Sequence, residues 1–82
     1  MKKTSVFIAD DHPVFRGGLK TVLTGAGYDI VGEADTGGAA LKAISSMKPD
    51  IAILDITMPD IDGIAVTRRI ADEVPGTRVI IF

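Results

Sequence analysis

The chain has 82 residues, a net charge of -2 and no cysteine. This length suits one small domain, and 46% apolar with 24% charged residues is typical of a folded protein rather than a disordered one. The absence of cysteine excludes disulfides and thiolate metal sites, and with no Lys/Arg cluster beyond Lys2 and Lys3 we expect no direct binding to nucleic acid. The first apolar run is too short for a signal peptide or membrane span, so we expect a cytoplasmic protein without membrane contact.

Three apolar runs and one further strand-like segment alternate with three segments of helical period. Residues 6–9, 51–54 and 79–82 are continuously apolar, which is typical of strands buried on both faces of a parallel sheet, and residues 28–34 are predicted to form a further strand. Between the strands, apolar residues recur on one helical face: Phe15, Leu19, Val22 and Ala26, then Ala40, Ile44 and Met47, then Val66 and Ile70.

The residues at the boundaries agree with this division. Pro13 suits a first helical turn, Thr36 suits a helix cap, and Pro49 and Pro75 end the elements before them. The connections are too short for a linker or a second domain. The order βαβαβαβ with right-handed crossovers therefore predicts a doubly wound parallel α/β sheet covered by helices.

Three aspartates follow two of the predicted strands. Asp10 and Asp11 come directly after residues 6–9, and Asp55 comes directly after residues 51–54. Ligands of open α/β sheets bind at the carboxyl edge where the strand order reverses, so these carboxylates meet if the two strands are neighbours. Clustered carboxylates repel one another unless a cation compensates, and Mg²⁺ prefers such oxygen ligands. The cluster therefore predicts a magnesium site that holds a phosphate group against Asp55, whose carboxylate can act as a nucleophile.

With these residues in place, the chain resembles the receiver domains of two-component response regulators. The resemblance rests on the pair Asp10 and Asp11, on Asp55, and on the turn MPDIDG at residues 58–63. It covers the whole chain and implies the flavodoxin-like (CheY-like) fold. The stretch DDHPVFRGGL, residues 10–19, further resembles the subfamily whose full-length members carry a C-terminal LuxR-type DNA-binding domain.

The resemblance also implies a role for each acid. Asp55 would be the phosphoacceptor that takes a phosphoryl group from a sensor histidine kinase. Asp11, Asp55 and the backbone carbonyl of Thr57 would bind Mg²⁺ directly, and Asp10 would help largely through water. Such a chain is a signalling module rather than an enzyme, although family members catalyse their own aspartyl phosphorylation and dephosphorylation, and its output would be the control of transcription.

The chain departs from the family pattern at its end. The family pattern consists of five βα units, with a Ser or Thr after the fourth strand and a Lys after the fifth. Neither of these two positions exists in this chain. We therefore expect residues 1–82 to be the N-terminal part of a receiver, with about four strands and three helices, from which the remainder and any DNA-binding domain are missing. DNA would be contacted only through that missing domain.

An incomplete sheet suggests an alternative function. An apolar last strand without a neighbour, or a sheet face without a helix, invites association with another copy of the chain. A truncated fragment that self-associates without productive phosphorylation is therefore the alternative to the receiver function.

Other polar residues near the acids have structural interpretations. Asp60 and Asp62 suit turn formation and capping of the next helix. His12, the only histidine, lies beside the acids, and a metal role is conceivable, but we interpret it as a surface residue at the helix start. Arg16 either lines the same cleft or is solvated.

Two further functions conflict with the order of residues. Gly25 and Gly27 lie between a helix and a strand, whereas a dinucleotide-binding glycine loop follows the first strand and opens a helix. An aspartate-nucleophile phosphohydrolase also uses a strand-end Asp with Mg²⁺. That class carries Asp-x-Asp after its first strand, whereas here the nucleophile follows the third strand and Thr57 stands two residues beyond Asp55.

Overall fold

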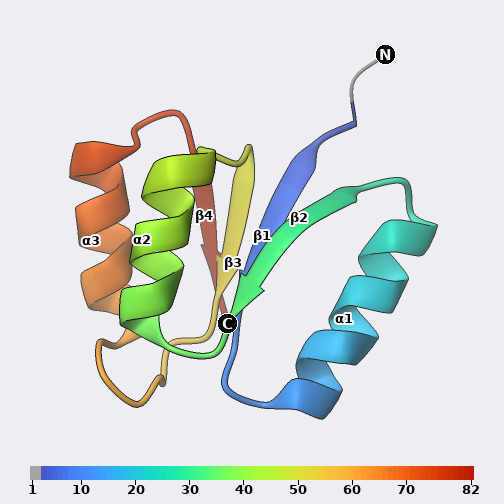
Figure 1. Ribbon diagram of the computed structural model, residues 1–82, viewed down its shortest axis with the longest axis horizontal. Helices are drawn as coiled ribbons and strands as arrows, with labels where there is room; N and C mark the ends of the chain where they lie inside the picture. The colour runs from blue at the N-terminus through green and yellow to red at the C-terminus, as the bar shows by residue number, and fades with distance from the viewer. Residues whose placement is uncertain (1–2) are drawn as a thin grey trace.

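Residues 3–82, which the computed structural model describes, form four parallel strands and three helices (Figure 1). In chain order the elements are β1 (Ser5–Ala9), α1 (Pro13–Gly25), β2 (Asp29–Ala34), α2 (Gly37–Met47), β3 (Ile51–Leu54), α3 (Gly63–Glu73) and β4 (Arg78–Ile81). The predicted doubly wound, flavodoxin-like α/β fold of four strands and three helices is confirmed.

The strands lie in the order β2-β1-β3-β4, so that β1 is paired on both sides. The chain crosses from β1 outward to β2 and then returns to β3 on the other side of β1. Because crossovers between parallel strands are right-handed, α1 lies on one face of the sheet and α2 and α3 lie together on the other (Figure 1). The strand order therefore reverses between β1 and β3, which is where open α/β sheets bind ligands.

The hydrophobic core lies between the sheet and the helices α2 and α3. Side chains alternate between the two faces of a strand, so every second strand residue points toward these helices. The fully buried core residues are Phe7, Ala9, Ala52 and Leu54 from the strands and Ala40, Ile44, Val66 and Ile70 from the helices.

The helix α1 forms where an amphipathic helix was predicted, but none of its residues is buried. It is the one helix on its face of the sheet among the described residues, and it leaves β3 and β4 uncovered there. Ile80 and Phe82 are each nearly half exposed, and the ring of Phe82 contacts that of Phe15 with 5.1 Å between centroids. We call Phe15, Ile80 and Phe82 the open face.

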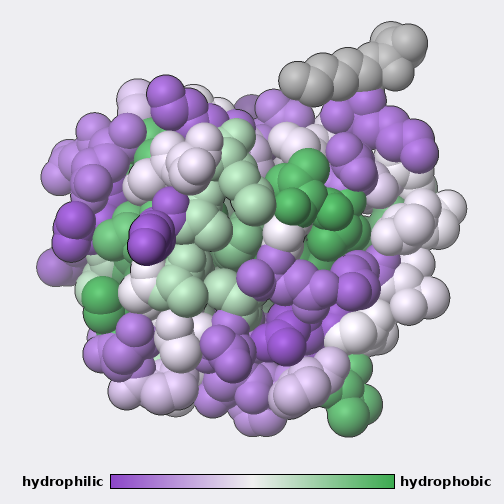
Figure 2. All heavy atoms as spheres, in the orientation of Figure 1, coloured by the Kyte–Doolittle hydropathy of each residue, from purple (hydrophilic) through white to green (hydrophobic). Residues whose placement is uncertain are grey.

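The remaining surface is mixed. Figure 2 shows apolar side chains gathered over β2, between α2 and α1, with hydrophilic side chains around them. Within residues 3–82, none of the helices is both long and apolar enough to cross a lipid bilayer.

Candidate functional site

Main-chain hydrogen bonds continue the sheet one residue beyond the strands and position two of the aspartates. Ala9 of β1 is the register partner of both Ala34 and Leu54. The backbone N–H of Asp10 donates to the carbonyl of Ala34 at 3.0 Å, and that of Asp55 donates to the carbonyl of Ala9 at 2.9 Å. Asp10 and Asp55 therefore leave the sheet side by side at its carboxyl edge, between β1 and β3.

Asp10, Asp11 and Asp55, which we call the acidic cluster, come together at this edge. One oxygen from each carboxylate and one ring nitrogen of His12 all lie within 4.8 Å of one another. Asp10 is 1% exposed, and its Oδ2 is buried without a hydrogen-bond partner in the described structure. A buried carboxylate oxygen is unfavourable unless a donor or a cation satisfies it. The oxygen ligands and the unsatisfied Oδ2 fit a hard divalent ion such as Mg²⁺.

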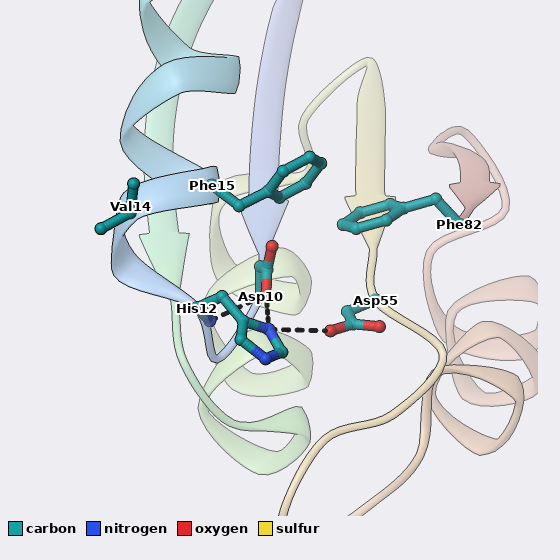
Figure 3. Close-up of a pocket in the computed structure, with 6 residues that line it drawn as sticks. All are labelled: Asp10, His12, Val14, Phe15, Asp55 and Phe82. Atoms are coloured by element: carbon teal, nitrogen blue, oxygen red, sulfur yellow. Dashed lines mark hydrogen bonds and ion pairs between the residues drawn. The ribbon is translucent and has the colours of Figure 1, made fainter.

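His12 contributes more to the site than its sequence interpretation suggested. His12 is the N-cap residue of α1, directly before Pro13. Its side chain is 71% exposed, as expected of a surface residue at a helix start. Its Nδ1 nevertheless lies 3.1 Å from Asp10 Oδ1, 2.9 Å from Asp11 Oδ1 and 3.8 Å from Asp55 Oδ2 (Figure 3). The hydrogen bond to Asp10, followed by the charge of Asp11, raises the pKa of His12. In the sequence, only the position of His12 directly after Asp11 indicated that it could contact the acidic cluster.

The loop after β3 fixes the Asp55 side chain. The backbone N–H of Thr57 donates to Asp55 Oδ1 at 3.1 Å, so this carboxylate is held by its own loop. The Asp55 side chain is 13% exposed and remains reachable from solvent. The backbone carbonyl of Thr57 as a metal ligand stays a prediction.

The two other aspartates of this loop serve different helices. Asp62 caps α3 by accepting the Ala65 N–H at 2.8 Å, in agreement with its sequence interpretation. Asp60 instead accepts the N–H groups of Gly37 and Gly38, at 2.7 and 2.8 Å, and therefore caps α2, the preceding helix. Backbone hydrogen bonds, that of Gly38 first, lower the pKa of Asp60.

Arg16 does not reach the carboxylates of the acidic cluster. Its Nη1 donates to the backbone carbonyl of Asp10, and its Nε donates to Glu33 Oε1 at 3.0 Å. Lys20 Nζ donates to the other Glu33 oxygen at 2.6 Å. Arg16 and Lys20 thus tie α1 to the end of β2, and the hydrogen bond from Lys20 is the main cause that lowers the pKa of Glu33.

An open cavity of about 670 Å³ adjoins the acidic cluster (Figure 3). Carboxylates and the imidazole line one side, and apolar side chains line the other. Its lining residues are Asp10, His12, Val14, Phe15, Asp55 and Phe82. A small anionic group can therefore reach Asp55 from solvent while the aromatic rings of the open face lie above it.

The fold and the strand-end acids define a doubly wound α/β domain with an acidic site at the carboxyl edge of its sheet, and comparison with known proteins places it in a family. The sequence model of the response regulator receiver domain matches residues 6–82. The chain belongs to this family of two-component signalling proteins.

The relatives include regulators of transcription and of chemotaxis. The chain is 42% identical over 82 residues to the transcriptional regulatory protein NarL of Mycobacterium tuberculosis. The aligned region covers 99% of this chain and 38% of that protein. It is 40% identical over 76 residues to the chemotaxis protein CheY of Thermotoga maritima, covering 93% of this chain and 63% of that protein. The chain thus spans less than two thirds of the length of these relatives.

Solved structures show the same fold. The signal receiver domain of the response regulator NarL from Mycobacterium tuberculosis superposes with a TM-score of 0.94 at 40% identity, covering 99% of this chain and 66% of that one. CheY in a CheX-CheY-BeF₃-Mg²⁺ complex from Borrelia burgdorferi superposes with a TM-score of 0.90 at 33% identity, covering 94% of this chain and 59% of that one.

Proposed function

We propose that the chain is the phosphoacceptor module of a two-component response regulator, in which Asp55 accepts a phosphoryl group from a sensor histidine kinase in a Mg²⁺-dependent reaction. One observation carries the proposal: Asp55 meets Asp10 and Asp11 at the carboxyl edge of the sheet, with ligand atoms within 4.8 Å of one another. Membership of the receiver family supports it.

Asp55 has the position of a nucleophile. Its carboxylate is held through Oδ1 by the Thr57 N–H, while Oδ2 faces the acidic cluster. In the transfer, an Asp55 oxygen forms a bond to phosphorus as the bond from phosphorus to the donor histidine nitrogen breaks. The electron pair stays on that nitrogen, which takes up a proton. Phosphoryl transfer depends mainly on positioning and charge stabilisation, and both requirements suit a preformed site at a sheet edge.

Asp10, Asp11, Asp55 and the backbone carbonyl of Thr57 are the groups that we expect to hold Mg²⁺, with the contact from Asp10 largely through water. When bound, the ion supplies positive charge that offsets the charge of the phosphoryl oxygens. The buried, unsatisfied Oδ2 of Asp10 supports this assignment. The Borrelia burgdorferi relative was solved with Mg²⁺ and BeF₃, which further supports a cation site beside the phosphoacceptor.

The partners and output follow from the relatives. Several of them are transcriptional regulators, so we propose that phosphorylation of Asp55 controls transcription in the cytoplasm, through a DNA-binding domain outside these 82 residues. The module is a signalling domain that labels itself rather than an enzyme that turns over a substrate. Spontaneous loss of its phosphoryl group would reset it.

The test is labelling with acetyl phosphate. The chain should take up acid-labile phosphate once per molecule with Mg²⁺ present, and Asp55→Asn should abolish the uptake. Asp72→Asn, an exposed aspartate on α3, is the matched control and should label like the wild type. Label retained by Asp55→Asn would show that the nucleophile is another residue. Multiple turnovers of an added phosphomonoester would instead identify a hydrolase.

A second function, self-association of the chain, has one observation in its favour. The open face leaves Phe15, Ile80 and Phe82 nearly half exposed, and β4 is an edge strand with one side unpaired in the described sheet. Apolar surface beside an unpaired strand edge is a site where a second copy can pack. Self-association and phosphorylation can be tested separately.

A further inference from the structure

Arg16 holds the stretch of main chain that carries two of the three clustered acids. Its Nη1 donates to the backbone carbonyl of Asp10. This carbonyl belongs to the peptide unit that joins Asp10 to Asp11, and a peptide unit is planar. A donor that fixes the carbonyl therefore fixes the plane from which both carboxylate-bearing residues extend. Arg16 thus acts on the acidic cluster through the backbone, without reaching a carboxylate of the cluster.

The guanidinium itself is anchored on β2. Its Nε donates to Glu33 Oε1 at 3.0 Å, and Lys20 Nζ donates to Glu33 Oε2 at 2.6 Å. The Arg16 side chain is 19% exposed, so most of it is packed against the protein. Because a guanidinium is a planar fork of donors, its contact with Glu33 also sets the direction in which Nη1 points. Glu33 therefore orients Arg16 toward the Asp10 carbonyl.

The backbone of Asp10 is held at both of its polar groups. Its N–H donates to the carbonyl of Ala34 at 3.0 Å, and its own carbonyl accepts from Arg16. The strand β1 ends at Ala9, so the peptide unit after Asp10 leaves the sheet. We expect the orientation of this peptide unit to depend on Arg16 rather than on strand pairing.

We propose that Arg16 is a positioning residue of the cation site: by holding the peptide unit between Asp10 and Asp11, it keeps both carboxylates arranged for one divalent ion. The inference rests on the proposed cation site and adds a residue that supports it. Ligands that are already in place bind more tightly, because less conformational freedom is lost when the ion enters. Loss of this hydrogen bond should therefore weaken cation binding although every ligand is retained.

Charge and positioning predict opposite effects at this residue. Arg16 carries a positive charge close to the acidic cluster, so by charge alone its removal should strengthen the binding of a divalent cation. The positioning role predicts weaker binding instead. The direction of the change in affinity therefore distinguishes the two explanations.

The test is an NMR titration with Mg²⁺, followed through backbone amide resonances, of the wild type, Arg16→Met, Arg16→Lys and Lys20→Met. Lys20→Met is the matched control, because it removes the same charge from the same helix and also one hydrogen bond to Glu33. It leaves the hydrogen bond from Arg16 to Asp10 in place. Each titration is run well below the melting temperature of that protein, so that only folded molecules are compared.

The expected result is weaker binding that excess metal overcomes. Arg16→Met should raise the dissociation constant for Mg²⁺ by about tenfold, the size expected for loss of an outer partner of a metal site. Arg16→Lys should raise it by about threefold or more, since an ammonium cannot contact Glu33 and the carbonyl through one fixed fork. Lys20→Met should change it by less than about twofold, because its exposed charge is screened. Excess Mg²⁺ should restore acetyl phosphate labelling of both Arg16 variants, since Asp55 is unaltered.

Other outcomes would overturn the inference. Unchanged or tighter Mg²⁺ binding by Arg16→Met would show that Arg16 acts only through its charge, and an equal loss in Lys20→Met would refute the direct hold on Asp10. If Arg16→Met does not fold, Arg16→Lys decides, because wild-type affinity in that variant refutes the proposal and weaker affinity supports it.

The same titration separates this inference from the proposed function. If the wild type binds no Mg²⁺, the cation site fails and its support by Arg16 fails with it. Mg²⁺ binding that is insensitive to both Arg16 variants leaves the cation site standing and removes only the positioning role.

Discussion

The carboxylate of Asp60 accepts a hydrogen bond from the backbone N–H of Gly37 at 2.7 Å, across 23 positions of the chain. This contact ties the loop that carries Asp55 to the start of α2. It requires glycine, because a Cβ atom at Gly37 would overlap the backbone carbonyl of Ile61. The position of the loop that carries Asp55 thus depends on close packing against the start of α2.

Replacement of Gly37 tests this packing. Gly37→Ala should lower the free energy of unfolding by about 1–3 kcal/mol, because backbone rather than a flexible side chain must move. Gly18→Ala is the control, since nothing lies within 4 Å of a Cβ there. Gly18 is inside α1, where alanine should raise stability by about 0.5–1 kcal/mol. Urea unfolding midpoints give both values, and equal effects at the two positions would contradict the close packing.

The contacts of Glu33 predict a dependence of stability on pH. Hydrogen bonds from Lys20, and then from Arg16, lower the pKa of Glu33 below its usual 4.5 in the folded state. Its contribution is therefore fully present above pH 4.5 and is lost as the pH falls through the lower folded pKa.

Glu33→Gln should accordingly lower the free energy of unfolding at pH 7 by at most about 1 kcal/mol, since the side chains involved are partly exposed. The difference from the wild type should shrink as the pH is lowered stepwise from 4.5, and added salt should also reduce it. Urea unfolding at each pH measures it. A difference that stays constant down to the acid limit would contradict the role of the Glu33 charge.

The acidic cluster predicts opposite effects of one substitution with and without magnesium. In EDTA, Asp11→Asn should be at least as stable as the wild type, because it removes one of three like charges. At Mg²⁺ concentrations of 100 times the dissociation constant, the wild type should gain about 2.7 kcal/mol and the variant less. Melting temperatures measured in both buffers test this, with Asp72→Asn as a control that should respond to Mg²⁺ like the wild type.

The open face predicts self-association. We expect the chain to form dimers or larger species at micromolar concentration, and Ile80→Thr should shift it toward monomers by reducing the apolar surface that a second copy covers. Ile64→Thr is the matched control, since Ile64 is about equally exposed but lies at the start of α3, away from the open face. Light scattering measures the mass. A monomeric wild type would exclude self-association through this face.

The strands were predictable because their signal is local. Residues 51–54 were expected as a strand and form β3 as Ile51–Leu54, and residues 79–82 differ from β4, Arg78–Ile81, by one position. Continuous apolar runs bounded by proline and glycine suffice for such assignments. The convergence of Asp10 and Asp55 was predicted on the condition that their two strands are neighbours, and the pairing of β1 with β3 meets that condition.

What could not be predicted depends on contacts between distant parts of the chain. Asp60 stands near α3 in sequence, yet it caps α2, because the folded loop brings it to Gly37. The apolar face of α1 has the period of a buried helix, but burial depends on how many elements share that side of the sheet. The direction of the His12 ring likewise depends on three carboxylates from two strands, and residue spacing does not encode it.

The central position of β1 has a consequence for the newly made protein. Asp10 and Asp11 are synthesised early, but Asp55 joins them only after β3 has docked beside β1, 45 residues later in the chain, counted from Asp10 to Asp55. As long as Asp55 is still inside the ribosomal tunnel, the nascent chain therefore offers no complete site for a divalent ion. Binding of a cation would indicate that β1 and β3 have paired, and it would slow the separation of these two strands.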